Sequence, residues 1–159
     1  MLLAILLGLC GLVYWQFYRP SRYFPRVRGA ASLAAVPFEC LSPDLEQAKF
    51  SEGLDQALVA EIAKLDSTQV ISPSTVQRYR RLRMPTAIMA RLLGLDVIVE
   101  GTAQRFGPQI RISARLTDVH SGKLIWAEDH DVAAADLGQA EITAAGAVAA
   151  QVGRHLSPQ

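Results

Sequence analysis

The densest group of side chains that could perform chemistry is the polar run 128–131 (EDHD). Its surroundings predict a strand, and adjacent residues of a strand point to opposite faces, so at most two of these four side chains converge. A metal site would need further ligands, and the sequence does not place His120 or His155 beside the run. We interpret the run as a solvated strand end and expect no metal and no cofactor. An enzyme that uses it is retained as an alternative.

Other catalytic signatures are missing from the sequence. The glycines are isolated rather than grouped in a phosphate-binding loop, and there is no G-x-S-x-G nucleophile elbow. Cys10 lies in an apolar run and Cys40 follows a strand-like segment, so we do not expect a disulfide between them. A single cysteine near a strand end packs more often than it reacts. The sequence therefore predicts no catalytic residue and a protein that is not an enzyme.

A second group could bind anions rather than catalyse. It consists of Arg78, Arg80, Arg81 and Arg83. Such a cluster could contact lipid headgroups or nucleic acid, but arginines also favour the solvated last turn of a helix. We favour the helix-end interpretation and keep anionic-surface contacts as the alternative. A net charge of +1 gives the whole chain no global attraction for nucleic acid, so we expect no direct nucleic-acid partner.

The N-terminus has the pattern of a membrane anchor. Residues 2–18 carry no charge, crowd their aromatic rings at the C-terminal end and are followed at once by arginines. A run of about 17 apolar residues is near the lower limit for a helix that spans a bilayer. The pattern predicts an uncleaved transmembrane anchor at 1–18 and a basic linker at 19–32. A cleaved signal peptide would instead need a basic start and small residues directly after the apolar stretch.

The part of the chain that follows alternates between strand and helix patterns. Short apolar runs predict buried strands, and apolar residues at helical spacing predict an amphipathic helix. We expect Ser74 to cap the second helix and Gly94 to end the third. The predicted elements before residue 95 are strands at 33–38 and 68–72 and helices at about 50–65, 74–80 and 85–93.

The C-terminal part predicts an antiparallel meander and a last helix. Strands are expected at 96–105, 109–119 and 123–131. The middle strand alternates apolar residues with Arg, Ser and Thr, which is typical of a half-buried strand with one solvated face. A helix is expected over 137–156. Its predicted inward face consists of Ile142, Ala145, Ala149, Val152 and Leu156.

The element order is therefore β-α-β-α-α-β-β-β-α. Three consecutive antiparallel strands with helices before and after them predict a mixed sheet of about five strands. We expect an α/β (α+β) domain over 33–159, with helices packed mainly on one face of the sheet and one transmembrane helix in front.

Three segments within 36–156 resemble the TolB N-terminal-like domain, a family that is also related to the flagellar assembly protein FlgO. They are VPFECLSPDLEQAKFSEGLDQALVAEIAKL, QVISPSTVQRY and LLGLDVIVEGTAQRFGPQIRISARLTDVHSGKLIWAEDHD. Taken alone, Gly53 and Gly101 allow close backbone approach, Asp118 and Gly122 shape a turn, and Trp126 is a large anchor in the core or on the surface. The full set of motif residues is Pro37, Phe38, Gly53, Gly94, Glu100, Gly101, Asp118, Gly122 and Trp126.

The resemblance implies an α/β domain that is extracytoplasmic when a membrane helix precedes it. The positive-inside rule, applied to the arginines after residue 18, instead favours the cytoplasm, although Met1 alone forms the other flank. We expect a non-catalytic inner-membrane module with a periplasmic domain, which binds a protein or envelope ligand, assists assembly or regulates at the bacterial cell envelope. The alternative is a truncated piece of a membrane-spanning transcription or signalling regulator.

Overall fold

The computed structural model of the chain describes residues 29–42 and 45–157. The strands are β1 (Ala31–Ala35), β2 (Glu39–Cys40), β3 (Thr68–Val70), β4 (Val97–Phe106), β5 (Gln109–Asp118) and β6 (Leu124–Ala133). The helices are α2 (Leu45–Ile62), α3 (Pro73–Arg81), α4 (Thr86–Leu92) and α5 (Leu137–Leu156). The predicted anchor at 1–18 and most of the predicted linker lie outside the described residues. Within the described ranges, no helix has the length and apolar character needed to cross a membrane.

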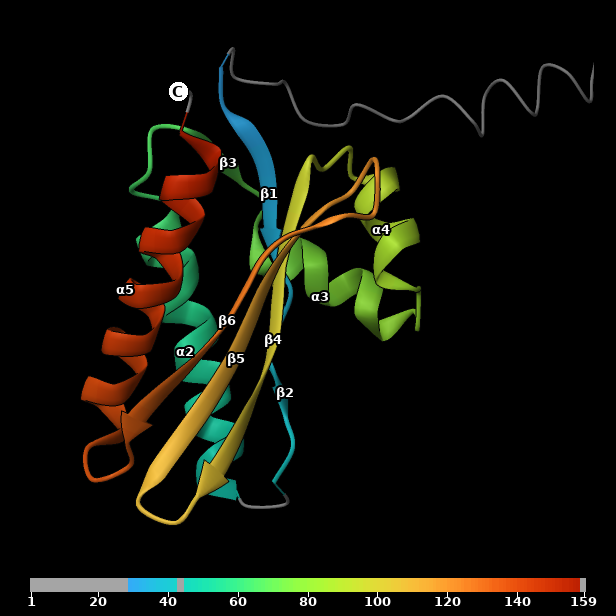
Figure 1. The fold of residues 1–159 in the computed structure, drawn as a ribbon. Helices are drawn as coiled ribbons and strands as arrows, with labels where there is room; N and C mark the ends of the chain where they lie inside the picture. The colour runs from blue at the N-terminus through green and yellow to red at the C-terminus, as the bar shows by residue number, and fades with distance from the viewer. Residues whose placement is uncertain (1–28, 43–44, 158–159) are drawn as a thin grey trace, which may run out of the picture.

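The strands form one mixed sheet in the order β3-β1-β4-β5-β6, and β2 is added beside β4. β1 is parallel to β3 and β4, whereas β4, β5 and β6 form the predicted antiparallel meander (Figure 1). β2 is also parallel to β4 and continues the line of β1 after a break. Pro37, which has no backbone N–H to donate to a neighbouring strand, lies in that break. The prediction of a mixed sheet is confirmed, with a two-residue strand added to the expected five.

One face of the sheet packs against the two long helices, α2 and α5, which lie side by side. Leu54, Leu58 and Ile62 of α2 are fully buried there, as their helical spacing predicted. On the sheet, this core takes the alternate residues Leu33 and Val99 from β1 and β4.

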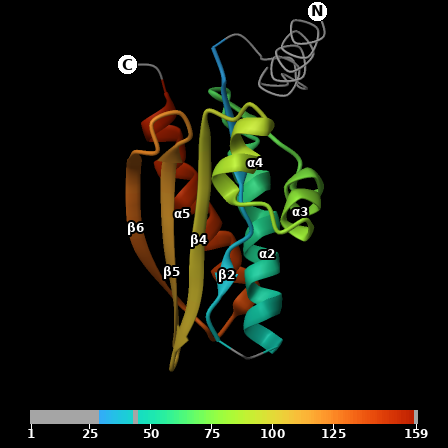
Figure 2. The same ribbon diagram turned by 90° about the vertical axis from the view of Figure 1, so that its right-hand side faces the viewer.

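The two short helices, α3 and α4, cover part of the opposite face (Figure 2). Ala34 of β1 and Ile98 of β4 point to this side and pack with Val76 of α3 and Met89 of α4 in a second, smaller core. The expectation of helices mainly on one face therefore holds for the long pair only. Hydrophobic periodicity gives a helix its buried side but not the face of the sheet that it covers.

Two helix ends were predicted from single residues, and one of these two predictions is confirmed. Gly94 follows α4 with a φ of +66°, which confirms it as the residue that ends this helix. The prediction that Ser74 caps α3 was wrong. The helix begins at Pro73 with Ser72 in the capping position, and no side chain makes a capping hydrogen bond. Proline favours the first helical position because its φ is already helical and no N–H is lost.

The predicted inward face of α5 was partly wrong. Ile142 is 58% exposed, although Ala145, Ala149 and Val152 are buried as expected. The buried face is centred on small residues, and this allows α5 to approach α2 closely. It consists of Ala140, Ala144, Ala145, Val148, Ala149 and Val152.

Candidate interaction surfaces

The predicted arginine cluster lies on the outer side of α3 and in its connection to α4. Arg78, Arg80 and Arg81 are exposed in the last turns of α3, as the helix-end interpretation expected. Arg83 is exposed in the connection and adopts a φ of +52°, a left-handed conformation that non-glycine residues adopt infrequently. Arg91 of α4 is exposed as well.

Large apolar side chains are also exposed on α4 and on its connection to α3. Leu82 is 67% exposed, Ile88 51% and Leu92 38%. Clustered exposed apolar residues are more informative than single ones, because they often mark a binding site. We call these three residues and the arginines at 78, 80, 81, 83 and 91 the basic surface.

The basic surface is connected to the sheet through Arg80 and Asp55. Nη1 of Arg80 donates a hydrogen bond to the carbonyl oxygen of Pro37 over 3.3 Å. Oδ1 of Asp55 on α2 accepts a hydrogen bond from the Phe38 N–H over 2.8 Å, in the same break between β1 and β2. Burial raises the pKa of Asp55 to about 7 and outweighs the lowering by the Phe38 N–H and the Arg80 charge. A shallow groove at this junction is lined by Pro37, Gln77, Arg80 and Arg81.

Two of the predicted motif glycines lie at close approaches. A Cβ at Gly101 would collide with the carbonyl oxygen of Ser113 and come 2.5 Å from the ring of Phe38. A Cβ at Gly53 on α2 would collide with the carboxylate of Glu141 on α5. Gly101 therefore lies where the backbone of a neighbouring strand comes close, whereas only a side chain approaches Gly53.

The remaining motif residues have structural contacts. The carboxylate of Asp118 accepts hydrogen bonds from the N–H and hydroxyl of Ser121, which hold its pKa below the ordinary value. Gly122 completes that turn with a φ of +70°. Glu100 pairs with Arg115 across the sheet at 3.1 Å.

Trp126 is half-buried on β6. Its ring lies 6.1 Å from the ring of His130 and 6.4 Å from that of His155 on α5, and its Nε1 donates to Glu128 over 3.2 Å. It packs against the main core, so it anchors β6 to α5 as its size suggested.

The polar run 128–131 is divided between the two faces of β6. Asp131 forms two hydrogen bonds of 2.8 Å with the guanidinium of Arg111 on β5, which lower the pKa of the carboxyl. Glu128, on the other face, also accepts from Gln151 of α5 over 2.8 Å. Among the described residues, no group of three or more His, Cys, Asp or Glu side chains is arranged to hold a metal ion. Cys40 has a free thiol that donates to the carbonyl oxygen of Ser42 over 3.1 Å.

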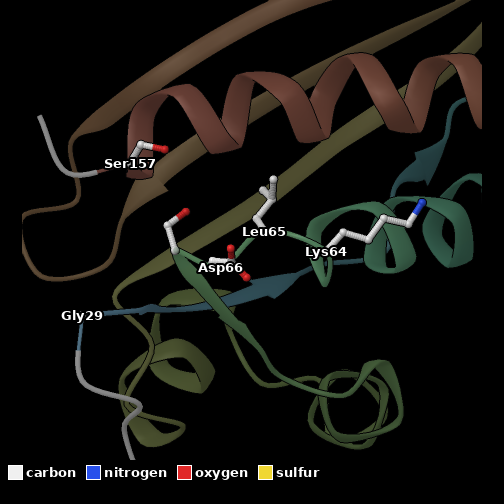
Figure 3. A pocket seen from close by; sticks show the side chains of 6 residues that line it. Gly29, Lys64, Leu65, Asp66 and Ser157 are labelled. Atoms are coloured by element: carbon white, nitrogen blue, oxygen red, sulfur yellow. The ribbon is translucent and has the colours of Figure 1, made fainter.

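A hollow lies where β1 begins and α5 ends (Figure 3). Its lining includes Lys64, Leu65, Asp66 and Ser157. The side chain of Lys64 extends away from Asp66 and Ser157 and pairs with Glu61 at 2.6 Å. The polar groups of this hollow therefore do not converge as the groups of a catalytic site would.

The edge strand β6 is a surface that sequence reasoning missed. Within residues 29–42 and 45–157, β6 pairs only with β5, so its outer edge has no neighbouring strand. Ala127, Asp129 and Ala133 are exposed on the side of the strand that faces away from α5. An edge strand presents a row of backbone N–H and C=O groups that can pair with another chain. The alternation of residues in β6 indicated a strand but could not indicate its place in the sheet.

Comparison with models of known protein families found no match. Among curated proteins, the chain is 29% identical over 107 residues to a protein from Rhizobium meliloti (strain 1021) that is named as candidate adenylate cyclase 3. The match covers 67% of this chain and 18% of that protein, so the chain spans less than a fifth of that relative's length.

Solved structures with the same fold include the dodecamer of a PelC substitution variant from Paraburkholderia phytofirmans, with a TM-score of 0.59 and 11% identity over 84% of this chain and 94% of that chain. Lipoprotein GNA1162 from Neisseria meningitidis has a TM-score of 0.56 and 20% identity over 80% of this chain and 99% of that chain. TolB from Acinetobacter baumannii has a TM-score of 0.51 and 18% identity over 78% of this chain and 29% of that chain. The expected likeness to TolB is thus supported at the level of the fold. The relation to FlgO and the membrane anchor stay predictions.

Proposed function

We propose that the chain is a non-catalytic binding or assembly module of the bacterial cell envelope. Residues 1–18 tether it to the inner membrane, and the folded domain binds a protein partner in the periplasm. The fold that it shares with TolB and with a lipoprotein supports an envelope role. The motif residues support a structural framework, because Gly53, Gly101 and Asp118 serve packing or turns.

The free edge of β6 is the observation that carries protein binding. A strand of ten residues offers enough backbone for an extended segment of a partner to add to the sheet. Trp126 holds the strand against α5 from the covered face, so the edge is preorganised. The side chains at 127, 129 and 133 remain available to select the partner.

Site-specific photocrosslinking in the native bacterium tests this binding mode. A photoreactive residue at Ala127, Asp129 or Ala133 is expected to give a discrete adduct that is heavier than the chain. The same residue at Gln56 or Ala60, exposed on α2, serves as the control. The proposal fails if both sets give the same adducts or if neither gives one. An adduct of twice the chain mass would identify the partner as a second copy.

The side of the membrane is tested separately with reporters fused after Gln159. Alkaline phosphatase activity is expected, because that enzyme matures only outside the cytoplasm. Fluorescence from a reporter that folds only in the cytoplasm, without phosphatase activity, would place the domain inside and overturn the periplasmic part of the proposal.

A second candidate function is the regulatory part of a larger signalling protein. The match to less than a fifth of a candidate adenylate cyclase favours it, because that relative combines a similar segment with a much longer chain. Mapping the transcript that encodes the chain tests this alternative. An in-frame DNA-binding segment upstream of the Met1 codon would support it, and a ribosome-binding site directly before that codon would oppose it.

A further inference from the structure

The charges of the folded domain are strongly separated. Between Asp66 and Asp96 the chain carries five arginines and no acidic residue. All fifteen Asp and Glu residues lie outside this segment, which contains α3 and α4. The chain before Glu39 is also free of acidic residues and carries four arginines between positions 19 and 28. The near-neutral net charge therefore averages over a strongly basic segment of the chain.

The position of this segment relative to the incoming chain is also informative. α3 and α4 lie on the face of the sheet opposite α2 and α5, and α4 lies at the end of the sheet where β1 begins (Figure 2). The described chain enters there at Gly29, after the linker residues. An extended segment of ten residues, 19–28, spans at most about 35 Å. A membrane that holds residues 1–18 is thus within reach of the basic surface.

We propose that the basic surface rests on the anionic phospholipid surface of the membrane to which the chain is tethered. Guanidinium groups bind lipid phosphates through paired N–H donors. Leu82, Ile88 and Leu92 enter the boundary between headgroups and acyl chains, as the apolar side chains of interfacial helices do. The inference rests on the tethering part of the proposed function and is independent of binding at β6.

The apolar residues favour lipid over other anionic partners. A nucleic-acid backbone is bound through charge and hydrogen bonds, and exposed aliphatic side chains supply neither. A lipid interface rewards charge and apolar area together. Each arginine near an anionic bilayer strengthens attachment about fivefold. Because the side chain of Arg80 is bonded to Pro37, the other four arginines supply this attraction, at the high local concentration that a tether provides.

Hydrogen exchange of the full chain in lipid nanodiscs tests the proposal. One set of discs contains phosphatidylcholine alone and the other includes phosphatidylglycerol. We expect the backbone amides of α3 and α4 to exchange at least threefold more slowly in the anionic discs, and this protection to disappear at 1 M salt. The variant Arg78→Gln/Arg81→Gln/Arg91→Gln should exchange at the same rate in both discs. These three arginines avoid Arg80, which bonds to Pro37, and Arg83, whose φ is positive.

The control variant Lys49→Gln/Lys64→Gln/Arg154→Gln removes the same charge from or beside α2 and α5, across the sheet. It should retain the protection. Equal exchange of α3 and α4 in the two discs would overturn the proposal, and so would equal loss of protection in both variants. The tether is read independently from co-elution of the chain with phosphatidylcholine discs. A tethered chain without protection in anionic discs contradicts only the lipid contact.

Discussion

The ring of Phe38 lies against the backbone of Gly101, where a side chain would occupy the same space. Phe38 belongs to the break between β1 and β2, and Gly101 lies in the neighbouring strand β4. The bare backbone at position 101 lets the buried ring of Phe38 pack directly against β4, in the core that α2 and α5 cover. The break, the ring and the glycine thus form one packing unit.

Replacing Gly101 with alanine should destabilise the domain. The added Cβ would meet the carbonyl oxygen of Ser113, which is fixed in β5, as well as the ring of Phe38. Overpacking of this kind costs about 1–3 kcal/mol. Urea unfolding followed by circular dichroism measures the loss. An unchanged unfolding free energy would show that the sheet adapts and that the contact is not restrictive.

Gly146→Ala is the matched control and should act in the opposite direction. Gly146 lies within α5, and a Cβ there would meet no atom within 4 Å. Alanine limits the unfolded chain and favours the helix, so we expect a stabilisation of about 0.5–1 kcal/mol. A destabilisation would mean that α5 is packed differently around this residue.

The effect of Gly53→Ala on the unfolding free energy should lie between those of Gly101→Ala and Gly146→Ala. The Cβ would meet only the carboxylate end of Glu141, a flexible side chain that can rotate away. We expect a change in unfolding free energy within about 0.5 kcal/mol, because the gain in helix propensity offsets the displacement. Removing the obstacle with Glu141→Ala should allow the alanine at 53 to stabilise the helix. If Gly53→Ala instead lowers the unfolding free energy in the Glu141→Ala background, the backbones of α2 and α5 are themselves too close for a Cβ at position 53.

Asp55 should make stability depend on pH in the direction opposite to that of an ordinary surface carboxylate. Its pKa is raised from 3.8 to about 7, so the folded state binds this proton more tightly than the unfolded state. The resulting stabilisation is complete below about pH 4 and is lost as the pH rises through 7. Asp55→Asn, whose amide oxygen can still accept the Phe38 N–H, should remove this dependence.

The measurement is the difference in unfolding free energy between Asp55→Asn and the unaltered protein from pH 4 to 8. Other titrating groups largely cancel in this difference. As the pH rises, the variant should become more stable relative to the unaltered protein, by at most about 1.4 kcal/mol per pH unit. A flat difference would show that Asp55 is ionised throughout and that its burial is compensated by Arg80.

Substitutions on α5 should separate its exposed and buried sides. Ile142→Gln should change the unfolding free energy by less than about 0.5 kcal/mol, because Ile142 is exposed. Val148→Ala should cost about 1–3 kcal/mol, because Val148 is fully buried in the main core. The reverse ranking would restore the inward face that the sequence predicted.

Local patterns in the sequence were sufficient for most element types. The alternation in β5, the spacing of Leu54, Leu58 and Ile62, and Gly94 each report a preference that needs no distant partner. The arginines at 78, 80 and 81 were correctly expected in the last turns of a helix. Their role, like that of the motif residues, stays a prediction.

Features that depend on packing between distant parts of the chain could not be predicted from the sequence. Ile142 was the most hydrophobic choice for the inner side of α5, but the close contact with α2 selects alanines instead. Asp55 follows a buried leucine on an amphipathic helix, and its sequence context is that of a solvated acidic residue. Only the fold brings the break between β1 and β2 next to it, where the Phe38 N–H donates to its carboxylate. The edge position of β6 follows from the order of strands in space, which one sequence does not specify.

The parallel pairing of β1 with β4 has a consequence for how the chain folds. Leu33 lies beside Val97, sixty-four positions later in the sequence, whereas β4, β5 and β6 are joined by short turns. Closing the long loop between β1 and β4 costs more conformational entropy than closing a short turn. It also gains few contacts for β1 until β4 is part of a formed sheet. We therefore expect the meander to form first and β1 to dock later onto the edge of β4. In refolding followed by pulsed hydrogen exchange, amides of β5 should become protected before those of β1.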